Sequence, residues 1–354
     1  MLIEDASTDP QVRPWLRDWA GRTQAQGPAQ VELIENAENL GFVGSVNRGL
    51  ERAGDFGDPV VLLNSDALVP PGWATRLLAP LYADDRVATV TPMSNDAEIF
   101  GAPVICTPAP LAEGQLERID RRAARLTPRS APVEAPTGAR CCMAMRAAFL
   151  DRVPAFDAAF GRGYGEEVDW CRKTAALGGR HVAATNLFVE HRGGESYGSD
   201  RKREHVIANN RIISGRYPAY DGLVQQFIMN DPLVTERLAL AVAWLDSLPD
   251  AAEVPVFIAH SLGGGAEHWL QDRLSGMTPR AALVLRFGGT HLCQVEAITP
   301  VGTTQAATDD LAAVRALVTD LGRRRVIYSC AVGDPDPTAL PGFIAGLAEG
   351  RPLE

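Results

Sequence analysis

The sequence predicts an α/β protein built from two units. Over the first two hundred residues, short apolar runs of strand length alternate with stretches of helical pattern, which is typical of a mostly parallel sheet with covering helices. After a proline-containing break near residue 249, the same alternation starts again at Val254. We therefore expect a first α/β unit with a mostly parallel sheet and a second, smaller α/β unit.

Composition limits the classes of function. With 354 residues, the chain can form two or three domains, and its 46% hydrophobic and 22% charged residues are ordinary for a globular protein. A net charge of −10 argues against nucleic acid as the main partner. We expect no transmembrane segment and no signal peptide. The six cysteines lack paired metal-ligand spacing, so we expect reduced thiols in a cytoplasmic protein, free or peripheral to the inner face of the membrane. The oligomeric state stays open.

The elements of the first unit follow from apolar runs and helical spacing. Residues 1–3 have the pattern of the end of a buried strand. Further strands are expected at residues 31–34, 60–63, 87–91 and 181–185, and helices at 12–22, 44–53, 73–82 and 167–177. Residues 102–135, rich in proline, alanine and charge, predict an irregular insertion that could cover a site.

The second unit begins after a connecting helix. Residues 231–248 have a helical pattern that ends before Pro249. The apolar strand VPVFIAH starts at Val254 and runs into a glycine-rich turn and a helical stretch that ends near Leu274. Strands at 282–287 and 325–329 and a helix at 311–321 follow. The predicted boundaries are 1–228 for the first unit, 229–253 for the helix and linker, and 254–354 for the second unit.

The segment GYGEEVDWC, at residues 163–171, is dense in acidic groups. It contains Glu166, Glu167 and Asp169 beside Trp170. Burial of a carboxylate costs solvation free energy, so such a cluster indicates a cation, a polar ligand or exposure at the start of a helix, where acids suit the helix dipole. Trp170 could stack on a sugar or pack in the core, and core packing is the commoner case.

Polar residues also follow two predicted strands. Asn64, Ser65 and Asp66 come directly after the strand at 60–63, and Asp5 and Ser7 follow the first strand. Ligands of open α/β sheets bind beyond the carboxyl ends of the strands, and an aspartate there can hold a divalent cation on a diphosphate. Turn formation by the first group and helix capping near the second are the structural alternatives.

Six segments, in order, resemble those of family 2 glycosyltransferases, which have a GT-A fold and use nucleotide-diphosphate sugars. They are IEDASTDP, NAENLGFVGSVNRGL, VVLLNSDALVPPGW, GARCCMAMRAAFLDRVPAFD, GYGEEVDWCRK and FVEHRGGES, which together span residues 1 to about 215. The resemblance implies a metal-dependent, inverting transfer of a sugar from a nucleotide-diphosphate donor to a glycan or other hydroxyl acceptor, in polysaccharide or surface-glycan biosynthesis. It also implies Mn²⁺ or Mg²⁺ as cofactor.

The resemblance implies roles for individual residues. Asp66 and His191 would bind the metal or the diphosphate, with Asn64 in place of the usual first acid of the motif. In the family's acidic pair, the second member is the catalytic base. Glu167 is therefore the first candidate for the catalytic base, ahead of Glu166 and Asp169. The nucleotide would contact Asp5, Ser7, Asn39, Asn47 and Ser65. The family's usual opening strand, which lines the nucleotide pocket, is not found in this sequence, so we expect an exposed sheet edge and an open pocket wall.

The second unit and the overall function each have competing interpretations. IAHSLGGGAEHWLQDRL resembles the first strand, glycine loop and helix of family 4 glycosyltransferases, which implies a partial GT-B, Rossmann-like domain. A hydrolase with Ser261 as nucleophile is rejected, because no convincing acid lies between Ser261 and the downstream His291. The alternative for the first unit is a non-catalytic nucleotide- or carbohydrate-binding module degenerate from a glycosyltransferase.

Overall fold

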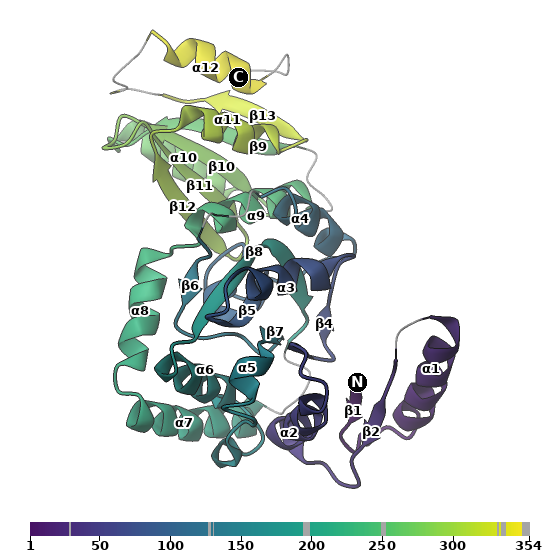
Figure 1. The fold of residues 1–354 in the computed structure, drawn as a ribbon. Coiled ribbons are helices and arrows are strands. Elements are labelled where there is room, and N and C mark those ends of the chain that lie inside the picture. Colours follow the sequence, from purple (N-terminus) through teal and green to yellow (C-terminus); the bar gives the residue numbers. More distant parts are fainter. Residues whose placement is uncertain are drawn as a thin grey trace.

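The computed structural model contains three sheets (Figure 1). It describes residues 1–27, 30–126, 129, 131–193, 199–248, 253–330, 333 and 338–348. A two-stranded sheet lies beside a central six-stranded sheet, and a five-stranded sheet follows toward the C-terminus. The α/β class predicted from the sequence is confirmed.

The N-terminal sheet is a single βαβ unit. β1 (Leu2–Glu4) pairs in parallel with β2 (Leu33–Glu35), and α1 (Val12–Gln26) connects the two strands. α2 (Gly41–Gly54) then packs against both β1 and β3 (Val60–Leu63). In the described part of the chain, β1 pairs only with β2 and β3 only with β7 (Cys142–Met145). Each of these strands therefore has one edge without a strand partner among the described residues.

The central sheet is mixed in direction. Its order is β3-β7-β5-β8-β4, with β5 at Val87–Ser94, β8 at Arg180–His191 and β4 at Ala67–Leu68, and β6 (Glu134–Ala135) pairs with β8. β5 and β8 are parallel, whereas β7 is antiparallel to both β3 and β5. The sequence did not predict β7, since a run of four apolar residues is too short for its periodicity to be recognised.

Two helices cover opposite faces of this sheet. Cys142 and Ala144 of β7 join the cluster under α3 (Trp73–Ala83), and Met143 and Met145 join the cluster under α6 (Glu166–Ala176). Side chains that alternate along a strand point to opposite faces, so α3 and α6 lie on the two sides. The remaining helices of this unit are η1 (Glu98–Phe100), α5 (Ala147–Leu150), η2 (Ala158–Phe160), α7 (Ser199–Arg216) and α8 (Tyr220–Asn230).

The prediction of an irregular insertion at 102–135 is wrong. This segment contains α4 (Gln115–Ala123), which packs on β8 and on α9 (Val234–Asp246). Asp120 of α4 forms an ion pair with Arg76 (Oδ2 to Nη2, 2.8 Å) and accepts a hydrogen bond from the Phe188 backbone. The helical signal was hidden because the apolar positions of α4 are embedded among charged residues. No described residue of 102–135 lines the cavity discussed below.

α9, predicted as a connecting helix, is buried between the two larger sheets (Figure 1). One hydrophobic cluster includes Phe188 of β8, Leu240 of α9 and Leu283 of β10, so the units share a continuous core. A helix buried on most of its circumference needs apolar residues on most of its faces, and α9 has them. Among the described helices, none has the length and apolar character needed to cross a membrane.

The C-terminal sheet has the order β12-β11-β10-β9-β13. Its strands are β9 (Val254–His260), β10 (Ala282–Phe287), β11 (Cys293–Thr299), β12 (Gly302–Thr308) and β13 (Arg324–Tyr328). β9 pairs in parallel with β10 and β13, and the unpredicted hairpin β11–β12 adds two antiparallel strands. The helices are α10 (Gly265–Ser275), α11 (Leu311–Thr319) and α12 (Leu340–Ala348).

Candidate active site

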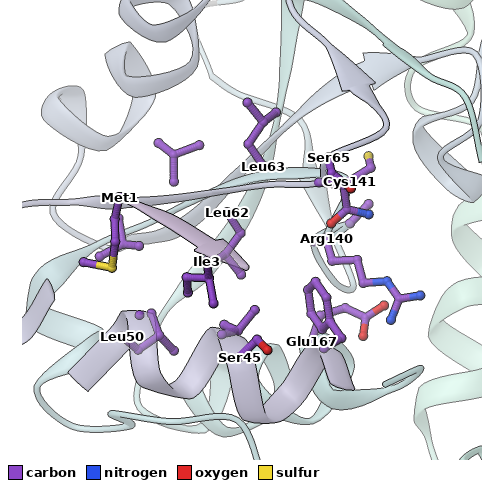
Figure 2. A pocket seen from close by; sticks show the side chains of 18 of the residues that line it. Met1, Ile3, Ser45, Leu50, Leu62, Leu63, Ser65, Arg140, Cys141 and Glu167 are labelled. Atoms are coloured by element: carbon purple, nitrogen blue, oxygen red, sulfur yellow. The ribbon is translucent and has the colours of Figure 1, made fainter. Parts of the chain in front are cut away.

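A cavity of about 1440 Å³ lies between β1, α2 and β3 and reaches the carboxyl end of β3. Figure 2 shows an apolar end with Met1, Ile3 and Leu50, and a polar end with Arg140 and Glu167. Residues of both β1 and β3 line this cavity. Its polar end contains the side chains with potential chemistry.

The sheet brings Asp66 and His191 together. β4 follows Asp66 directly and pairs with β8 so that Ala67 lies opposite His191. The His191 Nδ1 atom lies 2.8 Å from the Asp96 carbonyl oxygen. Because a carbonyl can only accept, this contact assigns the proton of the neutral ring to Nδ1. The lone pair of Nε2 then faces Asp66 Oδ1 at 3.4 Å. Asp66 Oδ1 is buried and has no hydrogen-bond partner.

Two acceptor atoms that face each other favour a cation between them. An imidazole nitrogen and a carboxylate oxygen are both ligands of divalent metals, and a hydrogen bond donated by the other ring nitrogen is the usual way to orient such a histidine. Within the described ranges, however, no three His, Cys, Asp or Glu side chains form a complete metal site. The protein side chains therefore offer a partial site.

Glu166 and Glu167 begin α6 but have different environments. Gly165 has a left-handed backbone (φ 102°) directly before the helix, and its N–H donates to Glu167 Oε2 at 3.2 Å. Glu167 lines the cavity. Glu166 is fully buried, and its Oε1 accepts a hydrogen bond from Arg140 Nη1 at 3.0 Å. Consecutive helical residues point about 100° apart, so one acid reaches the cavity and the other does not.

Burial raises the pKa of Glu166 to about 8, and the charge of Glu167 adds to this effect. The folded protein therefore keeps a proton that the unfolded chain releases near the ordinary value of 4.5. We expect the free energy of unfolding to fall as the pH rises between these two values, because the native state binds more protons in that window. Urea denaturation at about pH 5 and about pH 8 measures this.

The matched variants for this pH experiment are Glu166→Gln and Glu51→Gln. Glu166→Gln should reduce the loss of stability between the two pH values, whereas a change of the exposed Glu51 on α2 should not. Equal pH dependence in wild type and Glu166→Gln would contradict the assignment.

The structure does not bring Asp169 to the cavity. Its buried carboxylate accepts hydrogen bonds from Arg216 Nη1 (2.7 Å) and Tyr217 Oη (2.8 Å) and forms an ion pair with Lys173 (2.6 Å). These contacts tie α6 to the end of α7. Trp170 is fully buried and donates from Nε1 to the Val153 carbonyl at 2.8 Å, so the core interpretation of this residue is confirmed.

Asp5 and Asn39, two of the predicted nucleotide contacts, line the cavity, and Asp5 stabilises the start of α2. Asp5 Oδ1 accepts from Asn36 Nδ2 (2.7 Å) and from the Leu40 N–H (2.8 Å), and Oδ2 accepts from the Gly41 N–H (2.9 Å). Asn39 Nδ2 donates to the Asp5 carbonyl at 2.9 Å. A carboxylate oxygen has two acceptor sites, so Oδ2 keeps one for a ligand.

Among the other three predicted nucleotide contacts, only Ser65 lines the cavity in the described part of the chain, where it is exposed. Asn47 donates to the Phe156 carbonyl and accepts from the Phe156 N–H, each at 2.8 Å, so its amide joins α2 to the loop after α5. The Ser7 N–H donates to the Glu4 side chain near the start of α1. Asn47 and Ser7 therefore have local structural contacts.

Two further ionisable residues of the cavity, Glu98 and Arg140, were not predicted. Glu98 has a left-handed backbone (φ 46°), and the buried side chains of Ile99 and Phe100 hold this turn. Its side chain opens on the cavity, where the surrounding protein and then the charge of Glu167 raise its pKa. Glu98 and Arg140 are isolated charged residues that belong to no repeated pattern or motif of charged residues. Neither periodicity nor motif spacing could therefore identify them as residues of the site.

Part of the chain matches a known protein family. Residues 1–153 match the model of the family described as Glycosyl transferase family 2. This part of the chain is similar in sequence to that family. The match covers less than half of the 354 residues and ends before α6.

Among solved structures, the chain has weak similarity to two glycosyltransferases. One is GalNAc-T7 with UDP, GalNAc and Mn²⁺, at 18% identity and a TM-score of 0.43, over 59% of this chain and 41% of that one. Another is the mannosyltransferase PcManGT from Pyrobaculum calidifontis with GDP-Man and Mn²⁺, at 17% identity and a TM-score of 0.43, over 78% and 71%. This chain thus spans about two fifths of the first structure. A search of curated proteins gave no match. The GT-B resemblance of 254–354 stays a prediction.

Proposed function

We propose that the protein is a metal-dependent, inverting glycosyltransferase that moves a sugar from a nucleotide-diphosphate donor to a hydroxyl group of a glycan or other acceptor. The observation that carries this proposal is the pair formed by Asp66 Oδ1, which is buried without a hydrogen-bond partner, and His191 Nε2, 3.4 Å away at the cavity. The family match of residues 1–153 supports the reaction class.

Asp66 and His191 are the residues that would hold a divalent ion, Mn²⁺ or Mg²⁺. Because they supply two ligands, the other positions are left for donor oxygens and water, as is usual for an ion that is bound together with a substrate phosphate. When bound, such an ion acts as a Lewis acid that stabilises charge on the departing diphosphate.

Glu167 is the proposed general base. In an inverting transfer, the acceptor oxygen forms a bond to the anomeric carbon while the bond from that carbon to the diphosphate oxygen breaks. The proton of the acceptor hydroxyl moves to the Glu167 carboxylate. Of the three acids in its segment, Glu167 is the one that lines the cavity, so it is the one that can reach an acceptor there.

At the nucleotide end, Asp5 and Asn39 are the proposed contacts of the base or ribose. Asp5 Oδ2 accepts one protein hydrogen bond and can accept a second from a base N–H or a ribose hydroxyl. Ser65 would contact the donor between the two ends. A cytoplasmic enzyme of polysaccharide or surface-glycan synthesis, free or peripheral to the membrane, is the proposed setting.

Calorimetric titration of UDP, GDP and dTDP, with and without Mn²⁺, tests the donor site. We expect one nucleotide to bind in a metal-dependent manner. Asp66→Ala should remove the metal dependence and lower affinity by about 10–100-fold, the effect typical of disturbing a metal site. Asp58→Ala is the control, since Asp58 is an exposed acid lining the same cavity.

Two results would count against the proposal. Absence of binding by all three nucleotides would reject the donor site, and unchanged Mn²⁺ dependence in Asp66→Ala would reject the metal assignment. Metal-dependent binding without turnover would favour the alternative function, a nucleotide- or carbohydrate-binding module.

A further inference from the structure

We propose that Arg140 is the residue that binds the diphosphate of the donor, an inference that rests on the proposed function. Neither its sequence context nor the family match assigns a role to this residue. The geometry places a fixed guanidinium at the polar end of the cavity (Figure 2).

Arg140 lies beside the Asn64–Asp66 segment because of strand register. β3 and β7 pair antiparallel with Leu63 opposite Cys142, and the Asn64 N–H donates to the Cys141 carbonyl at 3.0 Å. Continued two residues beyond the Leu63–Cys142 pair, this register would place Arg140 opposite Ser65. A donor whose phosphates reach Asp66 would therefore pass close to Arg140.

The guanidinium of Arg140 is held in place before any ligand binds. Its Cζ atom lies 4.3 Å from the centre of the Tyr164 ring and 5.0 Å from that of Phe42. Nη1 donates to Glu166 Oε1 at 3.0 Å, and the side chain is about one-fifth exposed. A guanidinium has five N–H donors in a rigid plane, and a pre-positioned one loses little conformational entropy when it binds phosphate oxygens.

The segment before α6 leaves room for this guanidinium. Gly163 has a positive φ of 126°, and a Cβ added there would lie 2.9 Å from Arg140 Nη1. The backbone conformation favours glycine at this position, and the absence of a side chain leaves space for the Arg140 guanidinium.

The charges around the cavity make a fixed cation necessary for a diphosphate ligand. Asp66, Asp96, Glu98 and Glu167 all line the cavity, and together they repel a polyanion. Arg140 is held among these acids, and the negative charge of Glu167 and the hydrogen bond to Glu166 raise its pKa despite burial, so it stays charged. A second cationic side chain, Arg162, lines the cavity as well.

The test compares nucleoside diphosphates with their monophosphates. Dissociation constants of UDP, GDP and dTDP and of UMP, GMP and dTMP are measured in the presence of Mn²⁺ for wild type, Arg140→Gln and Arg140→Lys. We expect Arg140→Gln to weaken diphosphate binding by about tenfold or more, the size of one lost charge-assisted contact, and to change monophosphate binding much less. Arg140→Lys, which keeps the charge without the planar fork, should be intermediate.

Arg172→Gln is the matched control, because Arg172 lies on α6, bonds to the Pro136 carbonyl and is not among the residues that line the cavity. The double variant Arg140→Gln/Glu166→Gln removes both partners of the buried pair. It replaces Arg140→Gln in the binding measurements if the single variant does not fold. Equal weakening of both nucleotide classes, or no change in either, would overturn the assignment of Arg140. Absence of nucleotide binding in wild type would instead reject the proposed function.

Discussion

Glu167→Gln is expected to lower sugar transfer by about 10²–10⁴-fold, the usual contribution of a general base, while donor binding is retained. The amide cannot take the proton of the acceptor hydroxyl, but it is similar in size to the carboxylate, and its oxygen can still accept the Gly165 N–H. The measurement is release of the nucleotide from its hexose donors in the presence of acceptor, together with calorimetric binding of the nucleotide.

Glu166→Gln is the comparison variant for this experiment. Glu166 is buried and hydrogen-bonded to Arg140, so its loss should affect turnover less than the loss of Glu167. Full turnover in Glu167→Gln combined with lost turnover in Glu166→Gln would transfer the role of base to Glu166. Lost donor binding in Glu167→Gln would show that this residue acts on the donor.

Trp170→Ala is expected to lower the free energy of unfolding by about 3–5 kcal/mol, the range for truncating a large buried aromatic side chain. Trp170 is fully buried in the cluster under α6 with Met143, Phe149 and Phe160. The variant leaves a cavity there and deprives the Val153 carbonyl of its hydrogen bond from Nε1. Equilibrium urea denaturation measures the change.

Trp15→Ala is the control for the effect on stability. Trp15 is 58% exposed on α1 and stacks only against Trp19 among the described aromatic rings, so its removal should cost no more than about 1 kcal/mol. Unchanged stability in Trp170→Ala together with weaker acceptor binding would revive the stacking role.

The sequence was most informative where turn residues mark the ends of an apolar segment. The strand at Val60–Leu63 and the start of the helix at Trp73 were predicted at the observed residues, because turn residues bound these segments. The helix at Gln115–Ala123 and the strand at Cys142–Met145 were missed. Their apolar positions are too few, or too mixed with charge, to be separated from irregular chain.

The candidate site was predictable in its residue types but not in its geometry. Glu166, Glu167 and Asp169 could not be ranked by spacing alone, since a helix directs them to three sides, and the packing of α6 decides which side faces the cavity. Arg140 was not predictable, because its importance comes from the neighbouring strand and from Tyr164 and Phe42.

The sequence by itself determined the α/β class, the order of most elements, and the family 2 resemblance that residues 1–153 confirm. These properties follow from local patterns and from short motifs. Only the tertiary structure decided that β4 pairs with β8 and so places Asp66 against His191. It also decided that α9 joins two sheets in one core. Both outcomes depend on contacts between residues far apart in the chain, and no local pattern contains that information.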